Sequence, residues 1–313
     1  MADAHHHHSH AHEHGHDHGH DHAPKDFGRV FAIAIALNLT FVLAEAFVGL
    51  WASSLALLAD AGHNLSDVLA LVLAWGASVI AKRAPTSRRT YGLRKATILA
   101  SLANAILLLV AVGAIVSESV RRFMAPAPVA TQAVMLTAAL GVVLNTATAL
   151  LFLRGREDIN IRGAFLHMSA DAAISLAVVV GAGFIALTGL QWIDPMLSLG
   201  IAAVIVIGTA GLLRESVDMA LDAAPRGIDV DAVRAWLLDR PGVTEVHDLH
   251  VWAMSTTEVA LTAHLIRPEN PEGDAFLHEA CDGLAHRFGI GHATLQVETA
   301  ADVVCRLAPA EVV

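Results

Sequence analysis

Long apolar runs dominate the first two thirds of the chain and predict its architecture. A helix needs about 20 residues to cross a hydrocarbon core of about 30 Å, and each run is long enough for that. The predicted spans are residues 30–50, 54–81, 96–120, 129–153, 161–187 and 195–213. A mean hydropathy of +0.56 and only 16% charged residues, against about 25% in soluble domains, favour an integral membrane protein over a soluble helical core.

From about Asp222 the pattern changes to that of a soluble domain. Amphipathic periodicity predicts helices over residues 230–238 and 274–288, and alternation predicts strands over residues 243–253, 258–266 and 293–297. The order αββαβ suggests a small α+β domain of ferredoxin-like type that lacks its first strand. We therefore predict a six-helix transmembrane domain over residues 27–218, a second domain over residues 219–308 and a short tail over residues 309–313.

Basic residues beside the spans predict the orientation. Short cytoplasmic loops carry an excess of Lys and Arg. If the N-terminus is cytoplasmic, the outer face carries only Arg121 and Arg122. The inner face then carries twelve basic residues, which predicts both termini inside: Lys25, Arg29, Lys82, Arg83, Arg88, Arg89, Arg94, Lys95, Arg154, Arg156, Arg162 and Arg214.

The first 26 residues form a low-complexity tail that holds eleven of the nineteen histidines. Such a tract cannot build a core, so we expect it to be disordered without metal. Its alternating His, Asp and Gly favour a native tail over a purification tag, although His5 to His8 are consecutive. Imidazoles bind Zn²⁺, Ni²⁺, Cu²⁺ or Co²⁺ with little selectivity, so the tail predicts metal capture or buffering. A hydrophilic start does not fit a signal peptide.

Two His-x-x-x-Asp motifs, His63 with Asp67 and His167 with Asp171, lie inside the second and fifth spans. Residues four apart share one face of a helix. Ionisable residues are expensive in a membrane and usually functional. With six spans the two motifs run antiparallel, each about ten residues or about 15 Å from a membrane face. We therefore predict one four-ligand metal site at the midplane.

The alternative for the second span is a stripe of hydrogen bonds between helices, since polar groups also join membrane helices. Asp60, Asn64 and Ser66 fit that interpretation as well. Asn38, Glu45, Asn104 and Asn145 are equally open to packing or cavity roles. A pair of imidazole and carboxylate that recurs on two spans fits this hydrogen-bond interpretation poorly.

The donor set indicates which ion would bind. Two nitrogens and two carboxylates suit tetrahedral Zn²⁺. Ca²⁺ and Mg²⁺ prefer more oxygens, and Cu⁺ prefers sulfur. Cd²⁺ and Co²⁺ stay open.

These residues carry a family resemblance. Ser54 to Asp67, the second His-x-x-x-Asp, Thr90-Tyr91-Gly92 and the segment from His247 to Trp252 resemble the zinc-transporting branch of the cation diffusion facilitators. The resemblance covers nearly everything after residue 26. It implies a homodimeric, proton-coupled exporter with a cytoplasmic metallochaperone-like domain and a preference for zinc over cadmium.

The resemblance also implies metal ligands in the cytoplasmic domain, namely His247, His250, His264 and Glu298. Gln296 stands where some relatives have histidine, which argues against a full two-metal cluster. For His278, His286 and His292 ordinary surface roles are favoured. The loop over residues 85–95 lacks the ligand pair of some relatives, so we expect no site there.

We therefore predict a Zn²⁺/H⁺ antiporter of the lipid bilayer, in a bacterial plasma membrane, with divalent metal ions and protons as substrates. A broader Zn/Cd/Co/Ni exporter, or a zinc sensor or store without flux, is the alternative. An intramembrane metalloenzyme is disfavoured, because no span carries His-Glu-x-x-His and a closed four-ligand site leaves no open position. Cys281 and Cys305 are expected to be free thiols, and nothing indicates nucleic-acid binding.

Overall fold

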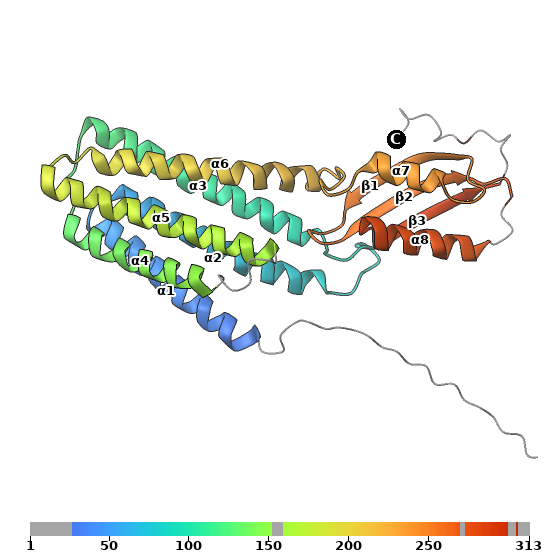
Figure 1. Cartoon of the computed structure of the whole chain (residues 1–313), viewed down its shortest axis with the longest axis horizontal. Helices are drawn as coiled ribbons and strands as arrows, with labels where there is room; N and C mark the ends of the chain where they lie inside the picture. Colours follow the sequence, from blue (N-terminus) through green and yellow to red (C-terminus); the bar gives the residue numbers. More distant parts are fainter. Residues whose placement is uncertain (1–26, 152–158, 270–272, 300–304, 306–313) are drawn as a thin grey trace, which may run out of the picture.

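The computed structural model describes residues 27–151, 159–269, 273–299 and 305. A bundle of long helices occupies one end of the elongated molecule, and a small sheet with two helices occupies the other (Figure 1). The His-rich tail and residues 309–313 lie outside the described residues. The helices of the bundle are α1 (Phe27–Trp51), α2 (Leu55–Ala81), α3 (Ala96–Met124), α4 (Thr131–Leu151), α5 (Ile159–Thr188) and α6 (Ile193–Ala220).

Within the described residues, the five helices α2 to α6 are long and apolar enough to cross a membrane. α1 has 25 residues, but its described apolar stretch is the shorter one from Asn38 to Trp51, so a sixth span stays a prediction. α3 and α6 continue past the predicted ends at residues 120 and 213. The reason is that hydropathy marks the apolar part of a helix, whereas backbone hydrogen bonding continues into polar sequence.

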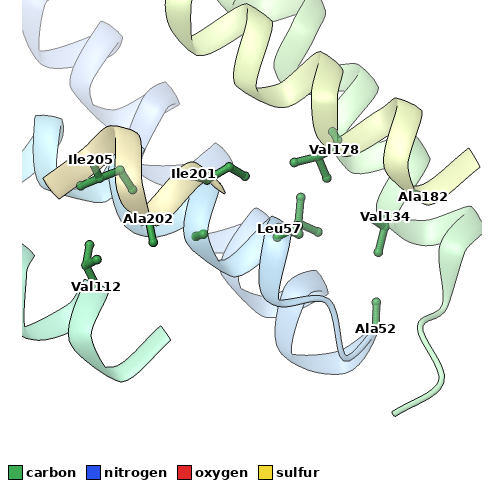
Figure 2. Close-up of a cluster of buried hydrophobic side chains, with 12 residues drawn as sticks. Ala52, Leu57, Val112, Val134, Val178, Ala182, Ile201, Ala202 and Ile205 are labelled. Atoms are coloured by element: carbon green, nitrogen blue, oxygen red, sulfur yellow. The ribbon is translucent and has the colours of Figure 1, made fainter. Parts of the chain in front are cut away.

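The bundle core is built from small and branched apolar side chains contributed by α2 to α6 (Figure 2). Half of the buried cluster is alanine, including Ala59 and Ala202. Lipid tails are as apolar as leucine, so membrane helices associate through close packing, and small residues let their backbones approach. In the same bundle α4 packs along α5, and α3 packs along α6.

A buried carboxylate at the start of α6 fixes the start of α2. Ser54 is the N-cap of α2, and its hydroxyl accepts a hydrogen bond from Leu57 N. Asp194 accepts from the Ser54 hydroxyl at 2.5 Å, from Leu55 N at 2.6 Å and from Ala56 N at 3.3 Å. Two otherwise unpaired donors of the first turn are thereby satisfied.

The second domain contains α7 (Val230–Leu238), β1 (Glu245–Ala253), β2 (Val259–Ile266), α8 (Asp274–Phe288) and β3 (His292–Glu298). The αββαβ order confirms the prediction, with strand bounds shifted by one or two residues. β1 and β2 are antiparallel, while β2 and β3 pair in parallel, in the order β1-β2-β3. Because the ferredoxin-like first strand is missing, the last strand lies directly beside β2.

The two helices cover one face of this sheet. Alternate strand residues, including Val251, Leu261 and Leu265, point into a core with Leu237 and Leu284. The side chains between them, including His247 and His264, belong to the other face, since successive residues of a strand alternate.

Exposed ion pairs connect the two domains. The Lys95 ammonium lies 2.6 Å from Asp222 Oδ1, and the Arg94 guanidinium pairs with Glu258. Thr256 N also donates to the Thr97 hydroxyl at 3.1 Å. The N-terminal end of α3 is therefore attached to the β1–β2 turn of the cytoplasmic domain.

Candidate metal centres

The first candidate centre lies between α2 and α5. There His63, His167 and Asp171 form a group of mutually close donors, and Asp67 lies beside both imidazoles. His63 Nε2 lies 3.2 Å from Asp171 Oδ1 and 4.0 Å from Asp67 Oδ2. His167 Nε2 lies 3.3 Å from Asp67 Oδ2 and 3.7 Å from Asp171 Oδ2. The two imidazoles meet edge to face, with 5.9 Å between ring centroids.

The four donors differ in exposure. The side chain of Asp171 is 2% exposed and that of His63 is 18% exposed, whereas Asp67 is 34% and His167 43% exposed. Nδ1 of His63 is buried and has no hydrogen-bond partner in the part of the chain that the structure describes. The centre is thus closed behind Asp171 and accessible beside His167, which suits an ion that enters and leaves.

The polar stripe of α2 has buried members beside the candidate ligands. Asp60 and Asn64 are buried and take part in a hydrogen-bond network between helices. The Asn64 amide donates to Glu45 Oε2 at 3.3 Å and lies 3.5 Å from Asp60 Oδ1, while the Ser175 hydroxyl donates to Asp60 at 2.8 Å. The hydrogen-bond interpretation of the stripe therefore fits Asp60 and Asn64, while metal coordination by His63 and Asp67 stays a prediction.

Hydrogen bonds of this network reach three helices. Glu45 is on α1, Asp60 and Asn64 are on α2, and Ser175 lies four residues after Asp171 on α5. Glu45 and Asp60 are both fully buried. The network therefore orients the two helices that carry the candidate ligands.

The second candidate centre lies on the face of the sheet opposite to α7 and α8. His247 of β1 is the direct partner of His264 on β2, so the two rings lie close, with 5.3 Å between centroids. Glu298, at the end of β3, places Oε1 3.0 Å from His264 Nδ1 and 3.6 Å from His247 Nε2. Three of the four residues predicted here are therefore together.

His250, the fourth predicted residue, points elsewhere. A bulge interrupts β1 between His247 and His250, and Asp248 within it has a left-handed φ of 48°. His250 Nε2 pairs with Asp248 Oδ1 at 2.8 Å, and the other oxygen of Asp248 lies 3.5 Å from His264 Nε2. His250 thus borders the centre through Asp248 but does not join the group of mutually close donors.

Comparison with known proteins shows the family of the chain. The family model described as the cation efflux transmembrane domain matches residues 31–219. The model described as the cation efflux protein cytoplasmic domain matches residues 225–300. The chain belongs to the cation efflux family.

Several members of the cation efflux family are similar over most of their length. The metal cation efflux system protein CzcD of Cupriavidus metallidurans is 35% identical over 87% of both chains. The zinc transporter ZitB of Escherichia coli is 35% identical over 85% of both chains. The cadmium, cobalt and zinc/H(+)-K(+) antiporter of Bacillus subtilis is 30% identical over 87% of this chain and 89% of its own. Proteins of this family are transporters rather than enzymes.

One solved structure overlaps with the cytoplasmic part. A metal-bound C-terminal domain of the CzcD transporter is 38% identical, covering 23% of this chain and 99% of its own. Its TM-score of 0.21 is too low to support an argument about the fold of the whole chain.

Two residues near the cytoplasmic centre escaped the sequence prediction for this member of the cation efflux family. Cys305 was expected only to be a free thiol, yet its Sγ lies 3.6 Å from His264 Nδ1. Asp248 lies within the segment from His247 to Trp252 that carries the resemblance, but its contact with His264 depends on the bulge. Cys305 belongs to no local spacing pattern, so only the fold brings it to the centre.

Proposed function

We propose that this chain exports Zn²⁺ from the cytoplasm in exchange for protons, through the centre formed by His63, Asp67, His167 and Asp171. The observation that carries the proposal is the convergence of two imidazoles and two carboxylates between α2 and α5. The activities for which the related transporters are named support metal cation export as the general activity.

The donor set supports zinc as the substrate. Nitrogen and carboxylate ligands in a four-coordinate arrangement match Zn²⁺, which proteins bind with such ligands in tetrahedral geometry. The centre contains no sulfur donor, which disfavours Cu⁺, and too few oxygens for Ca²⁺ or Mg²⁺. Transport of Cd²⁺ and Co²⁺ as well is the broader alternative, favoured by the related antiporter named for cadmium, cobalt and zinc.

The same donors support proton coupling. A histidine binds metal only when neutral, and a carboxylate binds best when ionised, so metal and protons compete for one set of atoms. A centre that opens to an acidic compartment would therefore release metal and take up protons. After the centre reopens to the cytoplasm, it would release the protons and bind metal again.

The remaining parts of the proposal concern assembly and location. We infer a homodimer with a regulatory metal bound by His247, His264 and Glu298, because the matched cytoplasmic domain offers these donors on one face. The twelve basic residues of the proposed inner loops against two outside support cytoplasmic termini. The bacterial relatives support a bacterial plasma membrane.

Flux measurements test the proposal. Purified protein in liposomes with an acidic interior should accumulate Zn²⁺ when metal is supplied at the cytoplasmic face. The Asp171→Ala variant should fall to the level of protein-free liposomes, because it removes the most buried donor. Thr188→Val is the matched control on α5, since its exposed hydroxyl donates to Phe184 O and accepts from Leu190 N at the end of the helix; it should keep wild-type flux.

The alternatives give different outcomes in the same experiment. Uptake by Asp171→Ala at the wild-type rate would refute the proposed site. Saturable zinc binding without any flux in the wild type would favour a sensor or store. Equal rates for Zn²⁺, Cd²⁺ and Co²⁺ would favour the broader exporter, and flux that ignores the pH gradient would refute proton coupling.

A further inference from the structure

The cytoplasmic centre contains a sulfur atom. Cys305 Sγ lies 3.6 Å from His264 Nδ1, the same nitrogen that lies 3.0 Å from Glu298 Oε1. One donor atom from each of His247, His264, Glu298 and Cys305 can be chosen so that all four lie within 4.8 Å of one another. Donors that surround one zinc ion tetrahedrally at 2.0–2.3 Å lie about 3.3–3.8 Å apart, so these four atoms would need to approach by no more than about 1.5 Å to bind one ion.

A buried imidazole in this group has no hydrogen-bond partner among the described residues. The side chain of His247 is 4% exposed, and neither ring nitrogen bonds to any of them. The carboxylate oxygens of Glu245 and Glu298 are each 3.6 Å away, which is beyond hydrogen-bond distance. An unsatisfied buried polar group is destabilising by about 1–3 kcal/mol, and a bound cation would relieve this cost at His247.

The position of the ring shows where that cation would lie. His247 faces His264 across the β1–β2 pair, and the Glu298 carboxylate approaches both rings. A cation among these atoms would satisfy Nε2 of His247 and lie next to the sulfur. This group lies on the face of the sheet opposite to the core formed with α7 and α8.

We propose that Cys305 is the fourth ligand of the cytoplasmic centre, and that this centre is a Cys-His-His-Glu site for a thiophilic divalent cation of the Zn²⁺ and Cd²⁺ class. The proposal rests on the regulatory site inferred above and is independent of transport between α2 and α5. It also separates the two centres chemically. A thiolate selects softer metals than imidazole and carboxylate do, so the cytoplasmic centre prefers Cd²⁺ over Co²⁺ more strongly than the transport centre does.

Sulfur-to-metal charge-transfer absorption in the ultraviolet tests the proposal on the reduced, full-length protein titrated with Cd²⁺. The histidines of the N-terminal tail bind metal without contributing to this band. The chain has only two cysteines, and Cys281 on α8 lies outside the group of close donors. Cys281→Ser is therefore the matched control for Cys305→Ser.

The expected result is a band whose final amplitude corresponds to one Cd²⁺–thiolate bond per chain in the wild type and in Cys281→Ser, and that is absent in Cys305→Ser. Glu298→Gln, which keeps the shape of the side chain, should shift the titration to at least about tenfold higher Cd²⁺. As a second readout, Cd²⁺ should slow alkylation of Cys305 by iodoacetamide and leave Cys281 unaffected, and a chelator should reverse this.

Three outcomes would overturn the proposal. A band that persists in Cys305→Ser would assign the sulfur to Cys281. If the wild type shows no band but His264→Asn still weakens Cd²⁺ binding, the regulatory site exists without a thiolate ligand. No band together with binding that is insensitive to both His264→Asn and Glu298→Gln would refute the regulatory site as well. Transport by Cys305→Ser should remain measurable in each case, which separates this test from that of the transport centre.

Discussion

Nε2 of His63 on α2 lies 3.2 Å from Oδ1 of Asp171 on α5, closer than the 4.0 Å to Asp67 on its own helix. The same holds for the second imidazole, which is nearer to the aspartate of the opposite helix. Each motif therefore pairs across the helix interface rather than along its own helix. A relative movement of α2 and α5 would change the spacing of all four donors at once, which is the coupling that alternating access needs.

The cross-helix geometry predicts how His63 contributes to selectivity. The His63→Asp variant replaces a nitrogen donor by a carboxylate, and a site with more oxygens accommodates a larger ion with more ligands. We expect the ratio of Zn²⁺ to Cd²⁺ uptake to fall by at least about tenfold, equivalent to about 1.4 kcal/mol of differential affinity. Competitive uptake of both ions into liposomes measures the ratio.

Ser78→Ala is the control for that substitution, since Ser78 is on the same helix and its exposed hydroxyl donates to Trp75 O. It should leave the ratio unchanged. A His63→Asp protein with the wild-type ratio would show that this imidazole does not discriminate between the ions.

Asp194 should be important for stability. Its carboxylate accepts three hydrogen bonds from the start of α2 and is 2% exposed. Asp194→Ala leaves the buried donors of Ser54 and Leu55 without a partner, which costs about 2–4 kcal/mol in total. Asp194→Asn retains an accepting oxygen and should lose less. Unfolding in mild detergent, followed by circular dichroism, should rank the proteins wild type, Asn variant, Ala variant; equal stability of the two variants would contradict this role.

The ion pair between Arg94 and Glu258 should contribute little by itself. Both side chains are more than 40% exposed, and an exposed pair contributes about 0–1 kcal/mol. Glu258→Ala should therefore change the free energy of unfolding by less than about 1 kcal/mol. Glu258→Lys places like charges beside Arg94 and Lys95, so it should loosen the contact between the domains at low salt and less at high salt.

Limited proteolysis at two salt concentrations measures this effect, with Glu269→Lys as a control for the added charge. Adding Arg94→Glu to Glu258→Lys should restore resistance. A double variant as sensitive as Glu258→Lys alone would show that the attraction between these two side chains is not the cause.

Cys281 should react slowly with alkylating reagents. Burial, together with the neighbouring Asp282, raises the pKa of this thiol above its ordinary value. A raised pKa lowers the thiolate fraction at any pH below it, and the thiolate is the reactive form. In a Cys305→Ser background the rate of alkylation at neutral pH should fall below that of a cysteine in a short peptide. The midpoint of the rate as a function of pH should also lie at higher pH than in the peptide. A midpoint at the peptide value would refute the effect.

The sequence alone predicted the hydrophobic spans and the four candidate transport ligands. Spans depend on about 20 consecutive residues and ligands on a spacing of four, and both are local properties of the chain. The αββαβ order was predictable for the same reason, because alternation within each strand reports its face. The predicted bounds were too short at the ends of α3 and α6, where the helix continues after hydropathy has declined.

Only the tertiary structure decided which residues from distant parts of the chain meet. Asp194 accepts a hydrogen bond from Leu55 N of α2, 139 residues away, and Ser175 bonds to Asp60. No spacing in the sequence predicts either contact. Because of the bulge at Asp248, His250 lies outside the group of close donors. The fold instead brings Cys305 next to His264. Such contacts depend on packing among several elements, so they are a property of the assembled fold and not of any single segment.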